Sequence, residues 1–308
     1  DLTYQWYKSP STLLIGETSA TLSFASTALS DSGSYYVIVS GNLVCGSETS
    51  ATATLNVNQV ITITDQPDDI TECEGNNITF NVTATGSIDS YQWRKNGVEN
   101  IGANSSSYSI TGIVTGDAGN YDVVISSVGG KCPTTISSSA ALSVDILTVV
   151  EAGGNLSTCQ SPTPSAITLS GASVSGGATT GAWSIISGGG SLSSLAQTAN
   201  PETITYTPAN NFTGSVTLRL TTNAPGTCPS TFDERTIIVD EAPIVVAGGP
   251  DDVCQTATPS PIILSGASVS GGANTAQWSI SSGGGSLSST ALTATPQNVT
   301  YTPAAGYT

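Results

Sequence analysis

Several residue types are rare or missing in this 308-residue sequence. It has no histidine and no methionine, charged residues make up 9%, and lysine and arginine together number six. Without histidine, Ser-His-Asp and Cys-His nucleophiles are excluded within these residues. The formal net charge of −16 provides no basic surface for phosphate groups, so we expect no nucleic-acid partner. No apolar run is long enough to span a bilayer, so we expect no membrane insertion in this segment.

The sequence is instead rich in repeats. Residues 168–183 return almost unchanged at 263–278, an offset of 95 residues. A different repeat occupies the first half, where Tyr4-Gln-Trp6 recurs as Tyr91-Gln-Trp93. The two repeats indicate two types of module. We predict four modules: a partial first module (1–58), a complete second (59–145), a complete third (146–240) and a partial fourth (241–308). Such tandem copying is typical of long, extended proteins, and we expect the segment to belong to a longer chain.

Short stretches with alternating apolar and polar residues, separated by Gly, Asn, Asp and Ser, predict β-strands throughout. In the second module the predicted strands are 77–83, 90–95, 107–110, 120–126 and 138–144. In the third module they are 166–169, 181–186, 202–206, 215–221 and 235–239. This pattern of regular short strands favours a two-sheet sandwich in each complete module.

The aromatic residues keep fixed places in the repeats. One tryptophan occurs in each module, within an alternating strand, and a core role is favoured over an exposed platform for sugars. The predicted core aromatics are Trp6, Trp93, Trp183, Trp278, Tyr35 and Tyr121. A strand tryptophan followed by Asp117-Ala-Gly-Asn-Tyr121 resembles the immunoglobulin-like family, although Val123 stands where antibody domains have cysteine. The resemblance implies an all-β fold of tandem immunoglobulin-like β-sandwich domains in an extended array.

Six cysteines are distributed as one early and one late cysteine in each module type. We therefore predict two bridges within modules, Cys73–Cys132 and Cys159–Cys228. Cys45 matches Cys132, and Cys254 matches Cys159, so their partners are expected outside this sequence. Disulfides require an oxidising compartment. Zinc is disfavoured, because the chain has neither histidine nor closely spaced cysteines.

Acidic residues gather where modules meet, and calcium favours such oxygen-rich sites. The candidate ligands are Asp65, Asp68, Asp69, Asp240, Glu241, Asp251 and Asp252. The alternative is that linkers carry acids because they are exposed to water, and no spacing here matches a known calcium loop. No other cofactor is expected. Nothing marks a pair of catalytic carboxylates, so we predict that the segment is not an enzyme.

The early Cys73-Glu-Gly75 and the Tyr-Gln-Trp motif resemble giant repetitive surface proteins of gliding and polymer-degrading Bacteroidota. The resemblance implies a stalk segment of an exported, extracellular cell-surface adhesin, of the type used for gliding motility or surface attachment. Its partners would be further copies of these modules, with an unidentified surface or polysaccharide ligand at a distant tip. The alternative is a set of spacer or carbohydrate-binding modules in a secreted multi-modular hydrolase.

Overall fold

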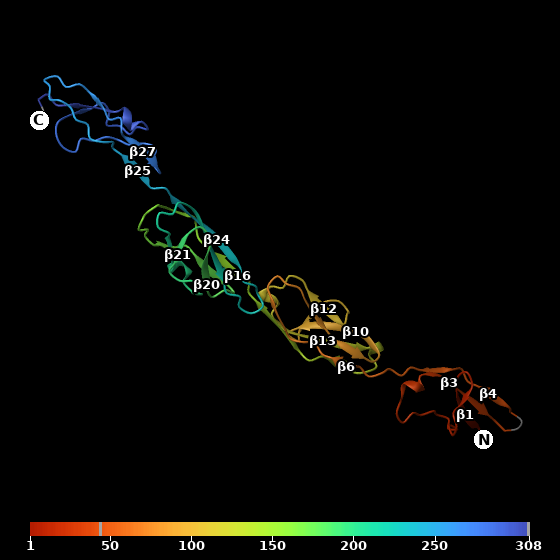
Figure 1. Ribbon diagram of the computed structural model, residues 1–308. Helices are drawn as coiled ribbons and strands as arrows, with labels where there is room; N and C mark the ends of the chain where they lie inside the picture. Colours follow the sequence, from red (N-terminus) through yellow and green to blue (C-terminus); the bar gives the residue numbers. More distant parts are fainter. Residues whose placement is uncertain (43–44, 307–308) are drawn as a thin grey trace. The chain divides into compact units, whose positions relative to one another are not determined.

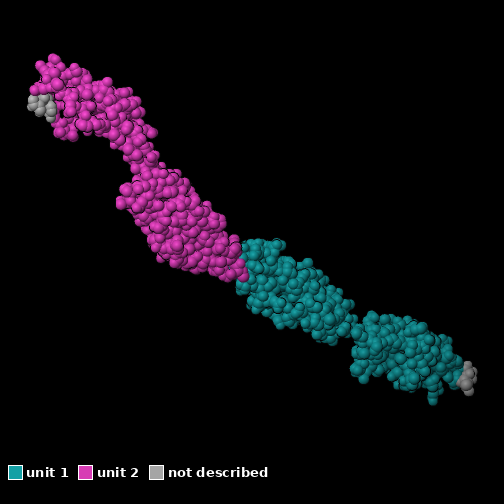
Figure 2. All heavy atoms as spheres, in the orientation of Figure 1, with its two compact units in different colours: residues 1–145 teal, residues 146–308 magenta. Residues whose placement is uncertain are grey.

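The computed structural model describes residues 1–42 and 45–306. The chain divides into two compact units, residues 1–145 and residues 146–308 (Figure 2). In the described part, regular structure consists of β-strands and short 3-10 turns, with no α-helix. The prediction of an all-β fold is confirmed.

The first module is built around a single sheet. Its strands are β1 (Thr3–Lys8), β2 (Thr12–Leu13), β3 (Gly33–Ser40), β4 (Ser47–Thr49) and β5 (Ala53–Leu55). The order in the sheet is β2-β1-β3-β4, and β5 also pairs with β3. A 3-10 turn, Leu29–Asp31, precedes β3.

The second module is a sandwich of the immunoglobulin-like kind (Figure 1). Its main sheet has the order β11-β10-β13-β15-β7, with β14 also paired to β13, and the ladders β12-β8 and β6-β9 lie outside this sheet. The strands are β6 (Thr62–Asp65), β7 (Ile70–Cys73), β8 (Ile78–Asn81), β9 (Thr83–Thr85), β10 (Ile88–Lys95), β11 (Glu99–Ile101), β12 (Ser107–Ile110), β13 (Gly119–Ser127), β14 (Thr135–Ile136) and β15 (Ala140–Asp145).

Side-chain alternation in β13 explains how this sandwich forms. Tyr121, Val123 and Ile125 are buried, while the residues between them face outward. Because successive strand residues point to opposite faces, this pattern turns one face of the main sheet inward. The inward face packs against Phe80 of β8 and surrounds Trp93 of β10, which is fully buried. The core therefore lies between the two layers.

The third module repeats this architecture with different strands (Figure 1). Its four-stranded sheet has the order β17-β24-β23-β20, and the other ladders are β18-β22-β21 and β16-β19. The strands are β16 (Thr148–Glu151), β17 (Leu156–Cys159), β18 (Ile167–Thr168), β19 (Ser173–Gly176), β20 (Gly181–Ser187), β21 (Gly190–Leu192), β22 (Thr205–Pro208), β23 (Gly214–Thr222) and β24 (Phe232–Asp240). Leu169, Trp183, Tyr206, Leu218 and Ile237 lie in one core that joins the layers.

The fourth module reproduces only one layer of the third within the described residues. Its ladders are β25-β27 and β26-β29-β28. The strands are β25 (Pro243–Val246), β26 (Ile262–Ile263), β27 (Ser268–Gly271), β28 (Gly285–Leu287) and β29 (Thr300–Pro303). The register of β26 with β29, which pairs Ile262 with Tyr301, repeats the register of β18 with β22, which pairs Ile167 with Tyr206.

Candidate functional site

The tryptophans of the complete modules serve the core and leave no ring face for a ligand. Trp93 and Trp183 are buried, and their indole Nε1–H groups donate to the backbone oxygens of Ser105 and Pro201, both at 3.0 Å. Each ring thus combines full burial with a satisfied polar atom, as a core aromatic requires.

The tryptophans of the partial modules make the same kind of bond but stay partly exposed. Trp6 donates to the backbone oxygen of Ser19 at 2.9 Å, and Trp278 donates to that of Pro296 at 3.0 Å. The indole hydrogen bonds of Trp6 and Trp278 therefore match those of Trp93 and Trp183, but their rings are only partly covered by other residues.

The predicted core tyrosines hold the turn that opens a late strand. Tyr121 is buried, and its hydroxyl donates to the backbone oxygen of Asp117 at 2.6 Å. Tyr35 is likewise buried and donates to the backbone oxygen of Asp31. In the second module the Lys95 ammonium lies 5.9 Å from the centre of the Tyr121 ring, within cation–π range. These contacts tie the 3-10 turn to the strand that follows it.

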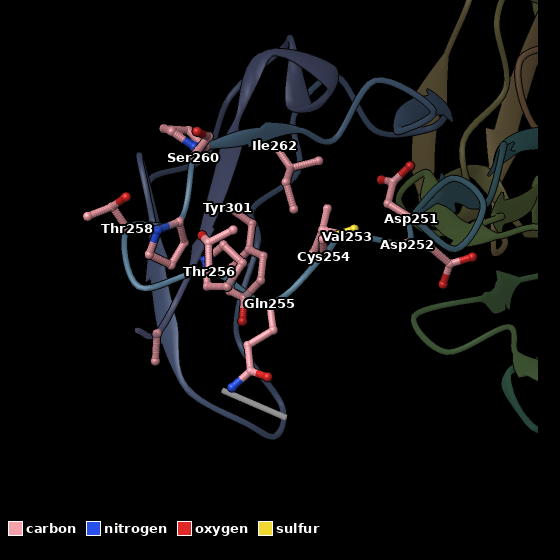
Figure 3. A pocket seen from close by; sticks show the side chains of 14 residues that line it. Asp251, Asp252, Val253, Cys254, Gln255, Thr256, Thr258, Ser260, Ile262 and Tyr301 are labelled. Carbon is pink, nitrogen blue, oxygen red and sulfur yellow. The ribbon is translucent and has the colours of Figure 1, made fainter. Parts of the chain in front are cut away.

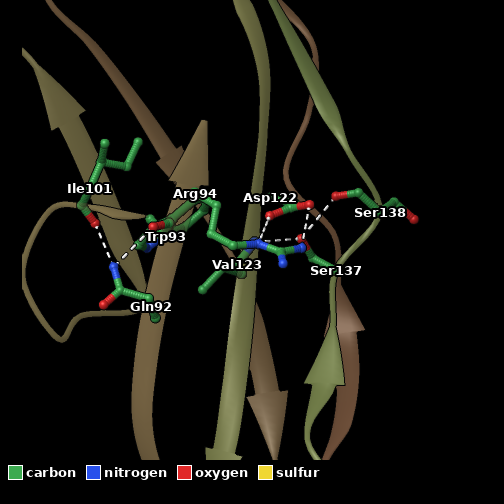
Figure 4. Close-up of polar contacts among 8 residues, drawn as sticks. All are labelled: Gln92, Trp93, Arg94, Ile101, Asp122, Val123, Ser137 and Ser138. Carbon is green, nitrogen blue, oxygen red and sulfur yellow. Dashed lines mark hydrogen bonds and ion pairs between the residues drawn. The ribbon is translucent and has the colours of Figure 1, made fainter. Parts of the chain in front are cut away.

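Polar side chains brace the outer face of the second module's main sheet (Figure 4). Arg94 of β10 makes a two-pronged ion pair with Asp122 of β13, at 2.8 and 2.9 Å. This pairing raises the pKa of Arg94 through hydrogen bonding to the carboxylate. Next to Asp122 on β13, the backbone N–H of Val123 donates to the hydroxyl of Ser137, the residue after β14, at 3.0 Å. The ion pair joins β10 to β13, and the Ser137 bond holds the segment after β14 against β13, so both contacts stiffen the sheet.

The groups with shifted pKa values do not form a catalytic pair. Burial raises the pKa of Tyr206, whose hydroxyl donates to the backbone oxygen of Gly189. Burial lowers the pKa of Arg235, whose guanidinium is held by the backbone oxygens of Gly154 and Ser170. Acid–base chemistry needs two such groups converging on one cleft, whereas these are separate structural groups.

A strand from the beginning of each complete module lies parallel to the last strand of that module. In the second module, β7 pairs with β15 from Ile70↔Leu142 to Cys73↔Asp145. In the third, β17 pairs with β24 from Leu156↔Ile237 to Cys159↔Asp240. Tension that pulls the start and end of a module apart along the strands acts on these ladders in shear. All their hydrogen bonds then bear load together instead of opening one at a time.

The early cysteines therefore lie at the end of each complete module. Cys73 and Cys159 are the last residues of β7 and β17, and each is in register with the final residue of the module's last strand. Backbone bonds extend the ladder one residue further, from Glu74 N–H to Asp145 at 2.9 Å and from Gln160 N–H to Asp240 at 2.7 Å.

The late cysteines lie at the opposite end, where each module starts. Cys132 exchanges hydrogen bonds with the side chain of Ser127, the last residue of β13, and its sulfur lies 3.7 Å from the backbone oxygen of Asn58. Cys228 lies in the β23–β24 connection, next to Pro229, whose carbonyl accepts a bond from Thr148 Oγ1 at 3.0 Å. Thr148 is the first residue of β16.

This placement makes both predicted bridges wrong. Cys132 and Cys159 are free thiols, whereas Cys73 and Cys228 are disulfide-bonded. Within the second module Cys73 and Cys132 lie beyond opposite ends of the nine-residue β13, a length of roughly 30 Å. A disulfide needs Cα atoms within about 7 Å, so neither module can close its own bridge. Cys45 and Cys254 are also free.

The acidic candidates for calcium are used locally or remain dispersed. Asp69 accepts a bond from the backbone N–H of Ala141 at 2.6 Å. Glu72, a neighbour in sequence, accepts from the backbone of Cys73 and from the side chain of Asn76, and these bonds lower its pKa. Over the described ranges, no three carboxylate, thiol or imidazole side chains gather as a metal-binding group. This includes the remaining candidates Asp65, Asp68, Asp240, Glu241, Asp251 and Asp252.

The fourth module contains a hollow of about 790 Å³ (Figure 3). Tyr301, Ile262 and Val253 line it, together with Cys254 and the carboxylates of Asp251 and Asp252. In the third module the counterpart of Tyr301 is Tyr206, which is fully buried in the core under β23 and β24. The hollow is thus the place that a second layer fills in the third module.

Comparison with known proteins shows tandem immunoglobulin domains. No family model and no curated protein matches the chain. An I-band fragment of titin aligns over 77% of this chain and 88% of its own length, at 13% identity and a TM-score of 0.48. Immunoglobulin domains 1–5 of Sidekick-1 align over 88% and 60%, at 16% identity and 0.37. The N-terminal eight immunoglobulin domains of Down Syndrome Cell Adhesion Molecule align over 88% and 36%, at 15% identity and 0.36.

The sheet orders and cores of the two complete modules describe each of them as a β-sandwich. No helix among the described residues has the length and apolar character needed to cross a membrane.

Proposed function

We propose that this segment is a load-bearing stalk of an exported cell-surface adhesin. The observation that carries the proposal is the parallel ladder between an early strand and the last strand in both complete modules, β7-β15 and β17-β24. Its shear geometry suits a chain under tension.

Short connections between modules support the same function. Only Ile146 and Leu147 separate β15 from β16, and only Glu241 and Ala242 separate β24 from β25. Connections of this length leave little slack, so tension passes from one module's last strand to the first strand of the next.

The finer assignment is a surface adhesin of the gliding-motility type, and it rests on the resemblance of the Cys73-Glu-Gly75 and Tyr-Gln-Trp motifs. Further modules in the same chain and a ligand at a distant tip complete this proposal. An antibody against the segment should label intact cells, and external protease should remove the label. Labelling only after lysis would contradict surface exposure.

Single-molecule stretching of the 308-residue chain tests the load-bearing role. Alternate N–H groups of a strand face the same neighbour, so the Glu72 N–H faces β15 as the Glu74 N–H does. In reducing buffer, Glu72→Pro in β7 should therefore lower the force needed to unfold the second module, because proline removes this donor from the sheared ladder. Ser109→Pro in β12 is the matched control, since Ser109 is exposed in a four-residue strand outside that ladder. Circular dichroism establishes that both variants fold. Equal unfolding forces in the two variants would contradict the proposed role of β7-β15.

The carbohydrate-binding alternative receives no support from the complete modules. Trp93 and Trp183 are 0% and 2% exposed, so neither ring offers a face on which a sugar could stack.

A further inference from the structure

The first module presents a row of apolar side chains on the outer face of its sheet, which is the face opposite Trp6 and Tyr35. Leu13 of β2 is in register with Tyr7 of β1, and Tyr7 is in register with Tyr36 of β3. Residues paired across strands point to the same face, so these three side chains lie side by side. This apolar row crosses three strands, a distance of roughly 10 Å.

The two tyrosines of the apolar row form a stacked pair. The ring centres of Tyr7 and Tyr36 are 5.3 Å apart, and the ring planes are 9° from parallel. The Tyr36 hydroxyl donates to the backbone oxygen of Pro10 at 3.3 Å, which fixes the direction of its ring. Both tyrosines are half-buried, and Leu13 is 48% exposed. The apolar row is therefore held in place and open to water.

The complete second module has polar and charged side chains at the same three register positions. Asn100 of β11 pairs with Arg94 of β10, and Arg94 pairs with Asp122 of β13. Figure 4 shows the ion pair that stands where the first module has stacked tyrosines. The Arg94 and Asp122 side chains are 22% and 14% exposed, so water also reaches this face in a complete module. The exposure of the apolar row therefore does not depend on which strands cover the other face.

The side chains that surround the apolar row carry no charge. The neighbouring outer-face positions hold Thr3, Gln5, Ser34, Ile38 and Thr49. Gln5 donates through Nε2 to the backbone oxygens of Trp6 and Leu14, at 3.1 and 2.7 Å, and its Oε1 is left to accept a bond. Lys8 points to the opposite face, where its ammonium lies 5.7 Å from the centre of the Tyr35 ring. The outer face thus combines aromatic rings with neutral polar groups.

We propose that the apolar row binds a neutral polysaccharide. One face of a pyranose ring presents C–H groups that pack on aromatic and aliphatic side chains, while its hydroxyls need donors and acceptors at the edge of the site. The Tyr7 hydroxyl and Gln5 Oε1 supply such groups. An anionic polymer finds no cation on the outer face of the described sheet. This inference goes beyond the proposed function, which places the ligand at a distant tip, and does not depend on it.

A protein partner fits this face less well than a sugar. A stable protein interface buries about 800 Å² on each partner, which three half-covered side chains do not supply. The row is narrow, and hydroxyl and amide groups border it. These features match the scale of a short run of linked sugar rings.

Affinity electrophoresis of the intact 308-residue chain tests the proposal. Native gels contain xyloglucan, galactomannan or β-1,3-glucan, and a gel with polygalacturonate provides an anionic polymer. Relative to a gel without polysaccharide, the chain should migrate more slowly in a neutral gel and normally in polygalacturonate. Tyr7→Ala should weaken this association about tenfold or more. Normal migration in all the neutral gels, or slowing in polygalacturonate alone, would overturn the proposal.

A swap between the two modules provides a variant that keeps the fold. Tyr7→Arg combined with Tyr36→Asp builds the ion pair that the second module already holds at these register positions. Hydrogen exchange of β1 and β3 should show that this variant folds, and the slowed migration should disappear. The matched control, Arg94→Gln with Asp122→Asn, changes the same positions in the second module and should migrate like the native chain. Retained slowing in the swap, or lost slowing in the control, would overturn the proposal.

Two further measurements separate sugar binding from self-association. Without polysaccharide, the native chain and Tyr7→Ala should have the same sedimentation coefficient at every concentration. A dimer that Tyr7→Ala disrupts would assign the row to an interface between copies and overturn the proposal. Oligosaccharides cut from the retained polysaccharide should slow amide exchange in β1 and β3 and leave β10 and β13 unchanged. Protection confined to β10 and β13 would place the sugar elsewhere and overturn the proposal as well.

Discussion

The third and fourth modules have nearly the same sequence where they overlap, but they bury their shared residues to different extents. Trp183 and Tyr206 are 2% and 0% exposed, whereas their counterparts Trp278 and Tyr301 are partly exposed. The local contacts are nevertheless the same. Each tryptophan donates to a proline oxygen at 3.0 Å, and each tyrosine hydroxyl donates to a glycine oxygen, that of Gly189 or Gly284.

The difference lies in the second layer. Residues 181–187 form β20 because they pair with β23, while residues 277–282 of the fourth module form no strand. Likewise β17 pairs with β24, while the matching residues 251–254 form no strand. One layer thus follows from local sequence alone, and the other requires a partner strand that is distant in the sequence.

The largest expected effect comes from supplying that partner. With residues 214–240 fused after Thr308, residues 277–282 should gain the protection that β20 has. We expect amide exchange there to slow by about a thousandfold, equivalent to about 4 kcal/mol of local stability. Hydrogen-exchange mass spectrometry measures the change. A fused segment of the same composition in scrambled order is the control, and equal protection from both fusions would contradict the explanation.

The second-largest expected difference between the third and fourth modules is in the stability that each loses when its tryptophan is replaced. Trp183→Ala should destabilise the third module by about 3 to 5 kcal/mol, because it empties a closed core. Trp278→Ala should cost the fourth module only about 1 kcal/mol, since its ring is already partly in water. Hydrogen exchange of β22 and β29 reports each module separately. Equal losses of stability in the two modules would mean that the second layer contributes little to the burial energy of Trp183.

A glycine within the shared layer should behave alike in both modules. Gly190 and Gly285 have φ values of +129° and +121°, and an added Cβ would lie 2.4 Å from the backbone oxygens of Thr207 and Thr302. Replacement by alanine should therefore destabilise each β-ladder by about 2 kcal/mol. Gly154→Ala, with open space around the Cβ, is the control. Hydrogen exchange again measures the two losses of stability. Clearly different losses in the two modules would show that the stability of the shared layer does not depend on local sequence alone.

Arg235 should give a smaller effect, confined to the third module. Its buried guanidinium donates to the backbone oxygens of Gly154 and Ser170, and no described residue of the fourth module replaces it. Arg235→Met should cost about 2 kcal/mol, because charged hydrogen bonds to buried carbonyls are lost. Arg219→Met, which removes a partly exposed ion pair with Glu234, should cost under about 1 kcal/mol in the same denaturation assay. The reverse order would contradict this role of Arg235.

Much of the fold was predictable from alternating residues. The strand predicted at 107–110 coincides with β12, and those at 181–186 and 215–221 lie within β20 and β23. In contrast, β7 and β17 were missed. Each has four residues, and its partner strand lies some seventy or more positions away, so local periodicity carries no signal for it.

The disulfide prediction failed for the same reason. The repeats correctly showed that each module type has an early and a late cysteine, and proximity in sequence then suggested a pair within each module. The missed strand β7 places Cys73 at one end of its sandwich, while the β13–β14 connection places Cys132 at the other. Spacing in sequence does not reveal which end of a strand a residue occupies.

The sequence by itself determined the module types, most strands and the inward-facing aromatic residues, because alternation and short-range turns encode them residue by residue. Only the tertiary structure decided which strands became neighbours, how fully Trp183 and Trp278 were covered, and that Cys73 and Cys132 lie at opposite ends of their module. Those features depend on pairing between distant segments, where the hydrogen bonds and apolar contacts of one strand are completed by another.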